Sequence, residues 1–237
     1  MTEATIAPTK PLVLRTSIGK KYAMAVSGVI LVGFVIAHMV GNLKFFFGEE
    51  HFDDYAAWIR RIGDPILPHY WALWLLRGVL LGAVGIHIWA AYATTRQSQQ
   101  ARPVRYAHTD NIQATYASRT MRWGGIILLA FIVFHILDLT VGAAHVGSFV
   151  ETTAEHGHAY SNAESGFQSV PVTLVYTFAM GALCLHLFHG IWSMFQTFGR
   201  NNHKLTGRLR ALAGLISVVV CLGFLAMPWA IMFGAKP

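Results

Sequence analysis

Five long runs of apolar residues alternate with polar, charged segments along this 237-residue chain. At about 20 residues, each run is long enough to cross the hydrocarbon core of a bilayer as a helix. The expected helices cover about residues 22–42, 71–92, 123–143, 170–199 and 211–233. The pattern predicts an all-α integral membrane protein, a five-helix bundle that forms a single transmembrane domain over residues 1–237.

The composition agrees with a membrane protein. Only 12% of the residues are charged and 54% are hydrophobic, whereas soluble domains carry about 25% charged residues. The net charge of +7 does not indicate a nucleic-acid partner, because the basic residues lie between the apolar runs. The first run is too long for a signal-peptide core and lacks a small-x-small cleavage site, so we expect it to be retained as a transmembrane helix.

The polar connections between the runs differ in character. The segment 44–70 contains the pattern Tyr55-Ala-Ala-Trp58-Ile-Arg60, which predicts a short amphipathic piece at the membrane interface. Residues 145–169 are rich in Gly, Ser, Glu and His, contain no Lys or Arg, and are expected to form a loop.

The distribution of basic residues predicts the orientation. The N-terminal tail and the connections 93–122 and 200–210 together hold 13 of the 18 basic residues. These are Lys10, Arg15, Lys20, Lys21, Arg96, Arg102, Arg105, Arg119, Arg122, Arg200, Lys204, Arg208 and Arg210. Cytoplasmic connections carry the excess of Lys and Arg, so we expect the N-terminus in the cytoplasm and the C-terminus outside.

Each of the first four runs contains a deep histidine, namely His38, His87, His135 and His186. A polar side chain at such depth is costly unless a partner holds it. With a rise of about 1.5 Å per residue, His38 and His135 lie roughly 24 and 18 Å from the cytoplasmic side, in the outer half. His87 lies roughly 8 Å deep and His186 roughly 20 Å deep by the same count.

Two histidine pairs on facing helices are what two bis-histidine haems require. The outer pair is His38 with His135, and the inner pair joins His87 to the fourth run. On the fourth run, the estimated depth does not decide between His186 and His189 as the partner of His87, although it slightly favours His189. Glycines would leave room for the macrocycles, at positions Gly28, Gly33, Gly78, Gly82, Gly85, Gly124, Gly125, Gly181 and Gly190.

Other residues have simpler interpretations. A single membrane histidine is more often a hydrogen-bonded helix contact than a ligand, and only the set of four favours haem. Arg77 is expected to snorkel, or to balance the charge of a haem propionate. Asp138 is expected at the outer end of the third helix, with a proton-handling role as the alternative. The loop histidines expected to be solvated are His51, His69, His108, His145, His156, His158 and His203.

Several motifs together resemble a known family. They are Ser17-Ile-Gly19-Lys20-Lys21 with Ser27-Gly28, Ala37-His38-Met-Val-Gly41-Asn42-Leu43, Phe46-Phe-Gly48 with Tyr55, and His186-x-x-x-Gly190-x-Trp192 with Gly199. The chain resembles the cytochrome b558-type membrane subunit of succinate dehydrogenase and fumarate reductase over almost its whole length. Singly, the motifs are weak evidence.

The resemblance implies a five-helix anchor of bacterial complex II in the cytoplasmic membrane, with two b haems. It implies His38 and His135 as axial ligands of the outer haem, and it selects His186, with His87, for the inner haem. It also implies a covalent-FAD flavoprotein and an iron–sulfur subunit as cytoplasmic partners, with a higher oligomer of the complex as an option. Some relatives carry a proton-transferring Glu where this chain has Cys184, so an identical proton path is in doubt.

A membrane quinone is the expected electron acceptor, and menaquinone suits a di-haem anchor better than ubiquinone. The candidate residues near the outer face are Asp64, His69 and Arg77. A second candidate pocket lies at the inner end, near Ser17, Lys20 and Lys21. The direction, succinate oxidation or fumarate reduction, is left open.

Other functions remain alternatives. One is the cytochrome b anchor of another quinone-linked dehydrogenase, such as a hydrogenase or formate dehydrogenase. Another is a transporter that uses its histidines as a proton relay, although no convincing inverted repeat is visible. The third is an anchor without haem, or with an iron–sulfur centre at Cys184. Two cysteines fall short of a four-cysteine site, so Cys184 and Cys221 are expected to be packing residues.

Overall fold

The computed structural model describes residues 16–101, 116–200 and 202–235. These residues form seven α-helices and one 3-10 helix, and no strand is found among them. In chain order the elements are α1 (Ser17–Asn42), η2 (Leu43–Phe47), α2 (Glu49–Arg61), α3 (Trp71–Gln100), α4 (Tyr116–Leu139), α5 (Ala159–Phe167), α6 (Val170–Thr197) and α7 (His203–Met232). The all-α prediction is confirmed.

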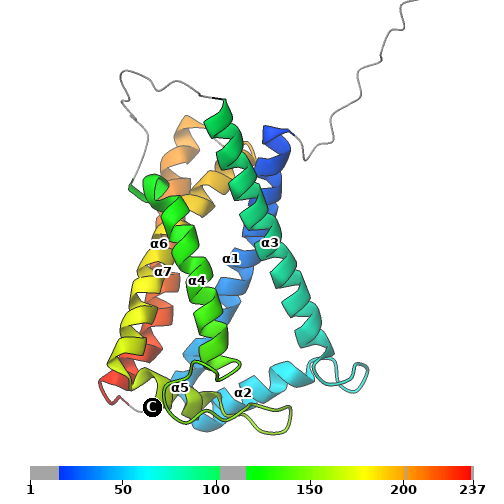
Figure 1. Ribbon diagram of the computed structural model, residues 1–237, viewed down its shortest axis with the longest axis vertical. Helices are drawn as coiled ribbons and strands as arrows, with labels where there is room; N and C mark the ends of the chain where they lie inside the picture. The colour runs from blue at the N-terminus through cyan, green and yellow to red at the C-terminus, as the bar shows by residue number, and fades with distance from the viewer. Residues whose placement is uncertain (1–15, 102–115, 201, 236–237) are drawn as a thin grey trace, which may run out of the picture.

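Five helices, α1, α3, α4, α6 and α7, are long and apolar enough to cross a membrane. They run alternately in opposite directions between two ends, and α2 and α5 lie across one of them (Figure 1). Large apolar side chains on these helices are exposed, including Trp74, Leu81 and Phe178. Such a continuous apolar surface suits contact with lipid, so the predicted membrane helical bundle is confirmed.

The two ends of the bundle differ in charge. We call the end where α1, α4 and α7 begin the basic end (Figure 1), because the described residues there include Lys20, Lys21, Arg96, Arg122, Arg200, Lys204 and Arg208. We call the opposite end, with η2, α2 and α5, the acidic end. Its connecting segments hold eight of the 11 acidic residues: Glu49, Glu50, Asp53, Asp54, Asp64, Glu151, Glu155 and Glu164.

Helices α1 and α6 occupy the middle of the bundle. Helix α3 packs on α1, α4 packs on α6, and α7 packs against both central helices. One buried apolar cluster, around Phe45, Phe167 and Met227, joins the acidic end to α6 and α7. A second, around Leu187 and Val220, fills the contact between α6, α7 and α1.

Most of the long helices extend beyond the apolar runs from which they were predicted. Helix α1 begins at Ser17, because the Thr16 hydroxyl accepts a hydrogen bond from the Gly19 N–H at 3.0 Å and caps the first turn. Helix α3 continues to Gln100, so its last two turns are polar. Helix α4 also begins earlier than predicted, at Tyr116, but its other end is shorter than predicted. It ends at Leu139, not near 143, and the chain turns at Gly142 with φ +80°.

The prediction of a loop over 145–169 is wrong in part, because α5 forms within it. The Asp53 carboxylate accepts a hydrogen bond from the Tyr160 N–H at 2.8 Å, which ties α5 to α2. The Asn162 side chain bonds both the N–H and the carbonyl of Val150, at 2.9 and 2.7 Å. These contacts close the segment over the end of the bundle.

The predicted amphipathic piece is the helix α2. It buries Phe52 and Ala57 and exposes most of its charged side chains. Glu49 and Glu50 stand in its first turn and Arg60 in its last, which complements the helix dipole.

Candidate functional site

The first candidate site lies between α1 and α4, toward the acidic end. The rings of His38 and His135 are 5.7 Å apart between centres and inclined at 72°. Phe34 stacks on His38, Phe131 stacks on His135, and Phe224 of α7 lies 5.6 Å from the His38 ring. The aromatic surroundings form an apolar environment for the pair, away from the charged connections.

The second candidate site lies between α3 and α6, toward the basic end. The rings of His87 and His186 are 6.1 Å apart between centres and inclined at 56°. The Nδ1 atom of His87 lies 3.2 Å from the Met24 carbonyl and 3.3 Å from the Ser27 hydroxyl of α1. A carbonyl oxygen only accepts hydrogen bonds, so it favours a proton on Nδ1 and leaves Nε2 available.

The atom His186 Nδ1 is buried and has no hydrogen-bond partner within the described residues. A buried polar atom without a partner is costly. No described residue therefore fixes the tautomer of His186 through its Nδ1.

The spacing of both pairs fits two axial imidazoles on one metal ion. Two nitrogens that bind from opposite sides, each about 2 Å from the metal, leave the ring centres about 6 Å apart. Within the described part of the chain, no group of three or more His, Cys, Asp or Glu side chains gathers to hold a metal. A metal between either pair would therefore need further ligands of its own, as haem iron has.

The histidine pairs join helices that are not the closest neighbours. The extensive contacts in the bundle are those of α1 with α3, α4 with α6, and α6 with α7. The pairs instead connect α1 to α4 and α3 to α6. Space between helices that pack loosely is what a flat macrocycle held edge-on would need.

The ring positions show which of His186 and His189 lies next to His87. Among the described residues, the ring of His87 approaches that of His186, and no ring contact joins it to His189. Depth slightly favoured His189, because the helix that contains His87 was expected to end near residue 92. Helix α3 reaches Gln100, so His87 lies well inside it.

One residue near the outer pair, His145, was misjudged from sequence. His145 was expected to be a solvated loop residue, but its side chain is only 1% exposed. Its Nδ1 lies 2.8 Å from Oδ1 of Asp138, which lies at the end of α4 as expected and is fully buried. The signal that sequence offered was an acidic residue inside an apolar run, which requires a partner.

Of the other described loop histidines, three are exposed as predicted and one is not. His51, His69 and His156 are exposed as expected, and His158 is half-buried. His108 lies outside the described residues, and the His203 side chain is not described. Both cysteines are free thiols, and Cys221 is buried beside the Met180 carbonyl.

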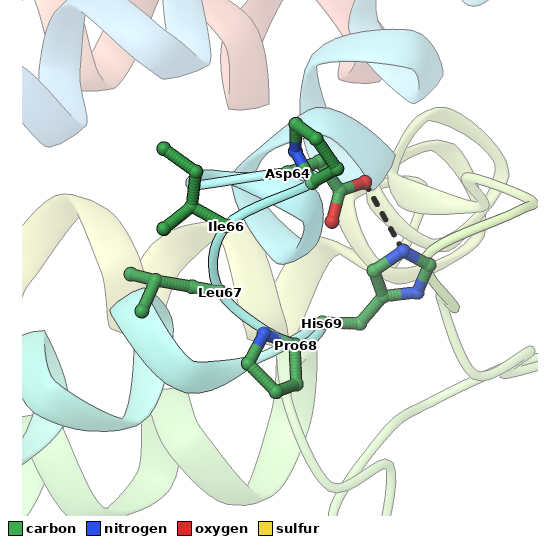
Figure 2. A pocket seen from close by; sticks show the side chains of 6 residues that line it. Asp64, Ile66, Leu67, Pro68 and His69 are labelled. Carbon is green, nitrogen blue, oxygen red and sulfur yellow. Dashed lines mark hydrogen bonds and ion pairs between the residues drawn. The ribbon is translucent and has the colours of Figure 1, made fainter.

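Of the three outer quinone candidates, Asp64 and His69 lie in the connection between α2 and α3, and Arg77 lies on α3. An open pocket of about 610 Å³ adjoins this connection and is lined by Asp64, Pro65, Ile66, Leu67, Pro68 and His69. Figure 2 shows these side chains. The His69 Nε2 lies 3.1 Å from Asp64 Oδ2, and its Nδ1 lies 3.8 Å from Glu155. The pocket is formed by a single loop, and Arg77 is not part of its lining.

The inner quinone candidates lie at the opposite end of the bundle. Ser17 and Lys21 are exposed in the first turns of α1, at the basic end. Between them in sequence, Lys20 donates a hydrogen bond from Nζ to the Gln97 side chain of α3 at 2.9 Å. The two sets of candidates are therefore separate sites on the two sides of the bundle.

Arg77 lies near a second arginine at the acidic end. Its guanidinium stacks over the Trp74 ring at 4.8 Å. Burial lowers the pKa of Arg60 from its ordinary value, Tyr70 opposes this, and the positive charge of Arg77 lowers the pKa further. The negative charge of Glu151 opposes this lowering of the Arg60 pKa, and an anion placed near both guanidinium groups would stabilise the pair in the same way.

Comparison with known families gives one match. A family model described as succinate dehydrogenase/fumarate reductase transmembrane subunit matches residues 95–225, more than half of the chain. The matched region includes His135 and His186, whereas His38 and His87 lie before it. Comparison with curated proteins and with solved structures finds no significant match.

Proposed function

This chain belongs to the succinate dehydrogenase/fumarate reductase transmembrane subunit family, and from that premise we propose that it is the di-haem anchor of its complex. In this proposal it carries electrons between the iron–sulfur subunit and a membrane quinone. The succinate- or fumarate-converting chemistry belongs to the partner flavoprotein. The observation that carries the proposal is the presence of two histidine pairs, each with ring centres about 6 Å apart.

In the proposal, His38 and His135 hold one b haem, and His87 and His186 hold the other. A haem bound in this way supplies one-electron transfer, and the chain supplies axial imidazoles, orientation and a surrounding of low polarity. Ser27, beside His87, precedes His38 on α1 by eleven residues, which corresponds to about 16 Å along the helix. The two histidine pairs thus follow one another along the length of α1.

Two glycines, Gly124 and Gly190, leave space for the macrocycle near the inner pair. A Cβ added at Gly124 or Gly190 would meet nothing within 4 Å. Gly190 is one turn beyond His186 on the same face of α6. Gly124 is three turns before His135 on the same face of α4, so it is level with the inner pair. Bulkier residues at both places would occupy the space that a porphyrin needs.

The arginines at the acidic end suit the propionates of the outer haem. Arg77 was expected either to snorkel or to balance a propionate, and its proximity to Arg60 favours the second role. In this proposal the two guanidinium groups face carboxylates that reduce their mutual repulsion.

The orientation and partners follow from charge. We place the basic end in the cytoplasm of a bacterial cell, according to the positive-inside rule. The basic connections then form the docking surface for the iron–sulfur subunit, with the covalent-FAD flavoprotein bound beyond it. His87 and His186, the pair nearer the basic end, would then be the histidines closer to the iron–sulfur subunit.

The quinone, proposed to be menaquinone, would react at one of the two ends. Asp64 and His69, with a hydrogen bond between them and an adjoining pocket, are the stronger candidates for proton exchange at the acidic end. Ser17 and Lys21 are the alternative at the basic end. The family membership disfavours a hydrogenase or formate dehydrogenase anchor and a histidine-relay transporter.

Purification of the chain from native membranes tests the proposed function. A tag on the chain should recover a covalent flavoprotein and an iron–sulfur protein in equal amounts with it. Added succinate should then reduce part of the b-haem absorbance. Recovery without any covalent flavin, or with a nickel- or molybdenum-containing partner, would contradict the proposal.

A further inference from the structure

A chain of hydrogen bonds leads from His135 to the acidic end of the bundle. The Nδ1 of His135 lies 3.1 Å from the Tyr176 hydroxyl, which donates to Oδ2 of Asp138 at 2.8 Å. The other carboxylate oxygen of Asp138 lies 2.8 Å from Nδ1 of His145. The Nε2 of His145 lies 2.9 Å from the hydroxyl of Ser165. Four consecutive contacts thus join α4, the loop after it, α5 and α6.

The middle of this chain is fully withdrawn from solvent. Asp138 has no exposed surface, the His145 side chain is 1% exposed, and Tyr176 is 6% exposed. Residues of these types are rarely so buried unless each polar atom has a partner. Both carboxylate oxygens of Asp138 have one. A simple tie between helices would not require the hydroxyl of Tyr176 to contact a candidate haem ligand as well.

The direction of the hydrogen bonds follows from proton counts. A tyrosine hydroxyl has one proton, and Tyr176 gives it to the carboxylate of Asp138. Its oxygen is then an acceptor, so His135 presents a proton on Nδ1 and keeps Nε2 free. A carboxylate that acts on a ligating histidine fixes the tautomer and raises the basicity of the ligand.

Among the described residues, neither histidine of the inner pair has a carboxylate acting on its Nδ1 in this way. The Nδ1 of His87 meets a backbone carbonyl and the Ser27 hydroxyl. The Nδ1 of His186 has no partner among the described residues. The two candidate haem sites therefore differ in the negative charge behind their histidines.

We propose that Asp138 is a positioning residue that acts through Tyr176 on His135 and lowers the midpoint potential of the outer haem. The inference rests on the proposed function, because it takes His135 to be an axial ligand. A more basic imidazole and a buried carboxylate both stabilise ferric over ferrous iron. His145 and Ser165 hold the carboxylate in place from the side of the acidic end.

The test is a potentiometric titration of both haems in the purified complex, for the wild type, Tyr176→Phe and Asp138→Asn. Each variant should raise the potential of one haem and leave the other unchanged, with haem content preserved. The double variant should shift the potential by less than the sum of the single shifts, because both act on one contact. The low-spin ferric EPR signal of the same haem should also move.

A matched control is Ser27→Ala, which removes a hydroxyl from the inner pair. Its effect should be confined to the other haem. A His38→Ala variant identifies which potential belongs to the outer haem, since that variant should lack it. If Tyr176→Phe loses its haem, Asp138→Asn, which keeps the phenol, decides the question.

The outcomes separate this inference from the proposed function. Unchanged potentials in haem-loaded variants, equal shifts of both haems, or loss of haem from both variants would reduce the network to a structural tie. A wild-type complex without haem would instead overturn the proposed function itself.

Discussion

Replacing His186 with alanine removes one of the two nitrogens proposed to hold the inner haem. The neighbouring His189 provides a matched control on the same helix, because its ring makes no contact with that of His87 among the described residues. His186→Ala should therefore lose the inner haem. His189→Ala should largely keep it.

The amount of haem that His186→Ala should lose follows from the distance between the two histidine pairs. His38 of the outer pair lies about 16 Å along α1 from Ser27, the nearer of the two residues that contact His87. Substitutions separated by more than about 10 Å, without shared partners, act nearly independently. The haem content of His186→Ala should thus fall from about two per chain to about one, with the outer haem intact.

The assay combines haem stoichiometry with spectroscopy. A pyridine haemochrome measurement gives haem per chain, and a low-temperature difference spectrum shows which b-type component is missing. Loss of the inner component in His189→Ala together with its retention in His186→Ala would reverse the ligand assignment. Loss of both components in His186→Ala would refute the independence of the two sites.

Four further predictions address other parts of the molecule. Gly124→Phe should reduce binding of the inner haem and spare the outer one, because the bulky ring would occupy open space level with the inner pair; haem content measures it. Arg77→Gln should lower the midpoint potential of the outer haem, since it removes a cation that favours the ferrous state, and redox titration measures the shift. Gly157→Ala should destabilise the acidic end by about 1–3 kcal/mol, because the added methyl would meet the backbone of Asp53; thermal unfolding in detergent measures it. Asp64→Asn should slow quinone reduction several-fold while succinate oxidation by an artificial dye stays unchanged, and an equal loss of both activities would contradict a quinone role.

The membrane helices were the most predictable part of the chain, because hydropathy determines them directly. Apolar length alone located α1, α3, α4, α6 and α7. Their polar extensions were missed, since the last turns of α3 contain no apolar signal. That omission caused the error in the depth of His87, because depth was counted from the end of the apolar run.

The acidic end was harder to predict. Helix α5 depends on tertiary contacts, such as the bond from Tyr160 to Asp53, more than a hundred residues earlier in the chain. Sequence periodicity carries no information about such partners. For the same reason His145 was misjudged, because its burial depends on Asp138 and Ser165, which lie on other elements.

The histidines were predictable as residue types and less so as pairs. An isolated polar residue in an apolar run already demands a partner. Which residue supplies that partner depends on how the helices pack. The histidines meet between α1 and α4 and between α3 and α6, which are helices that pack loosely on each other. No local sequence pattern specifies which helices pack in this way.

The most direct measurement is the haem content of the purified complex, with a spectrum recorded before and after succinate. We expect about two b haems per chain, with at least part of the absorbance reduced by succinate. A complex that contains the flavoprotein but no haem would contradict the central claim and leave the four histidines as structural groups.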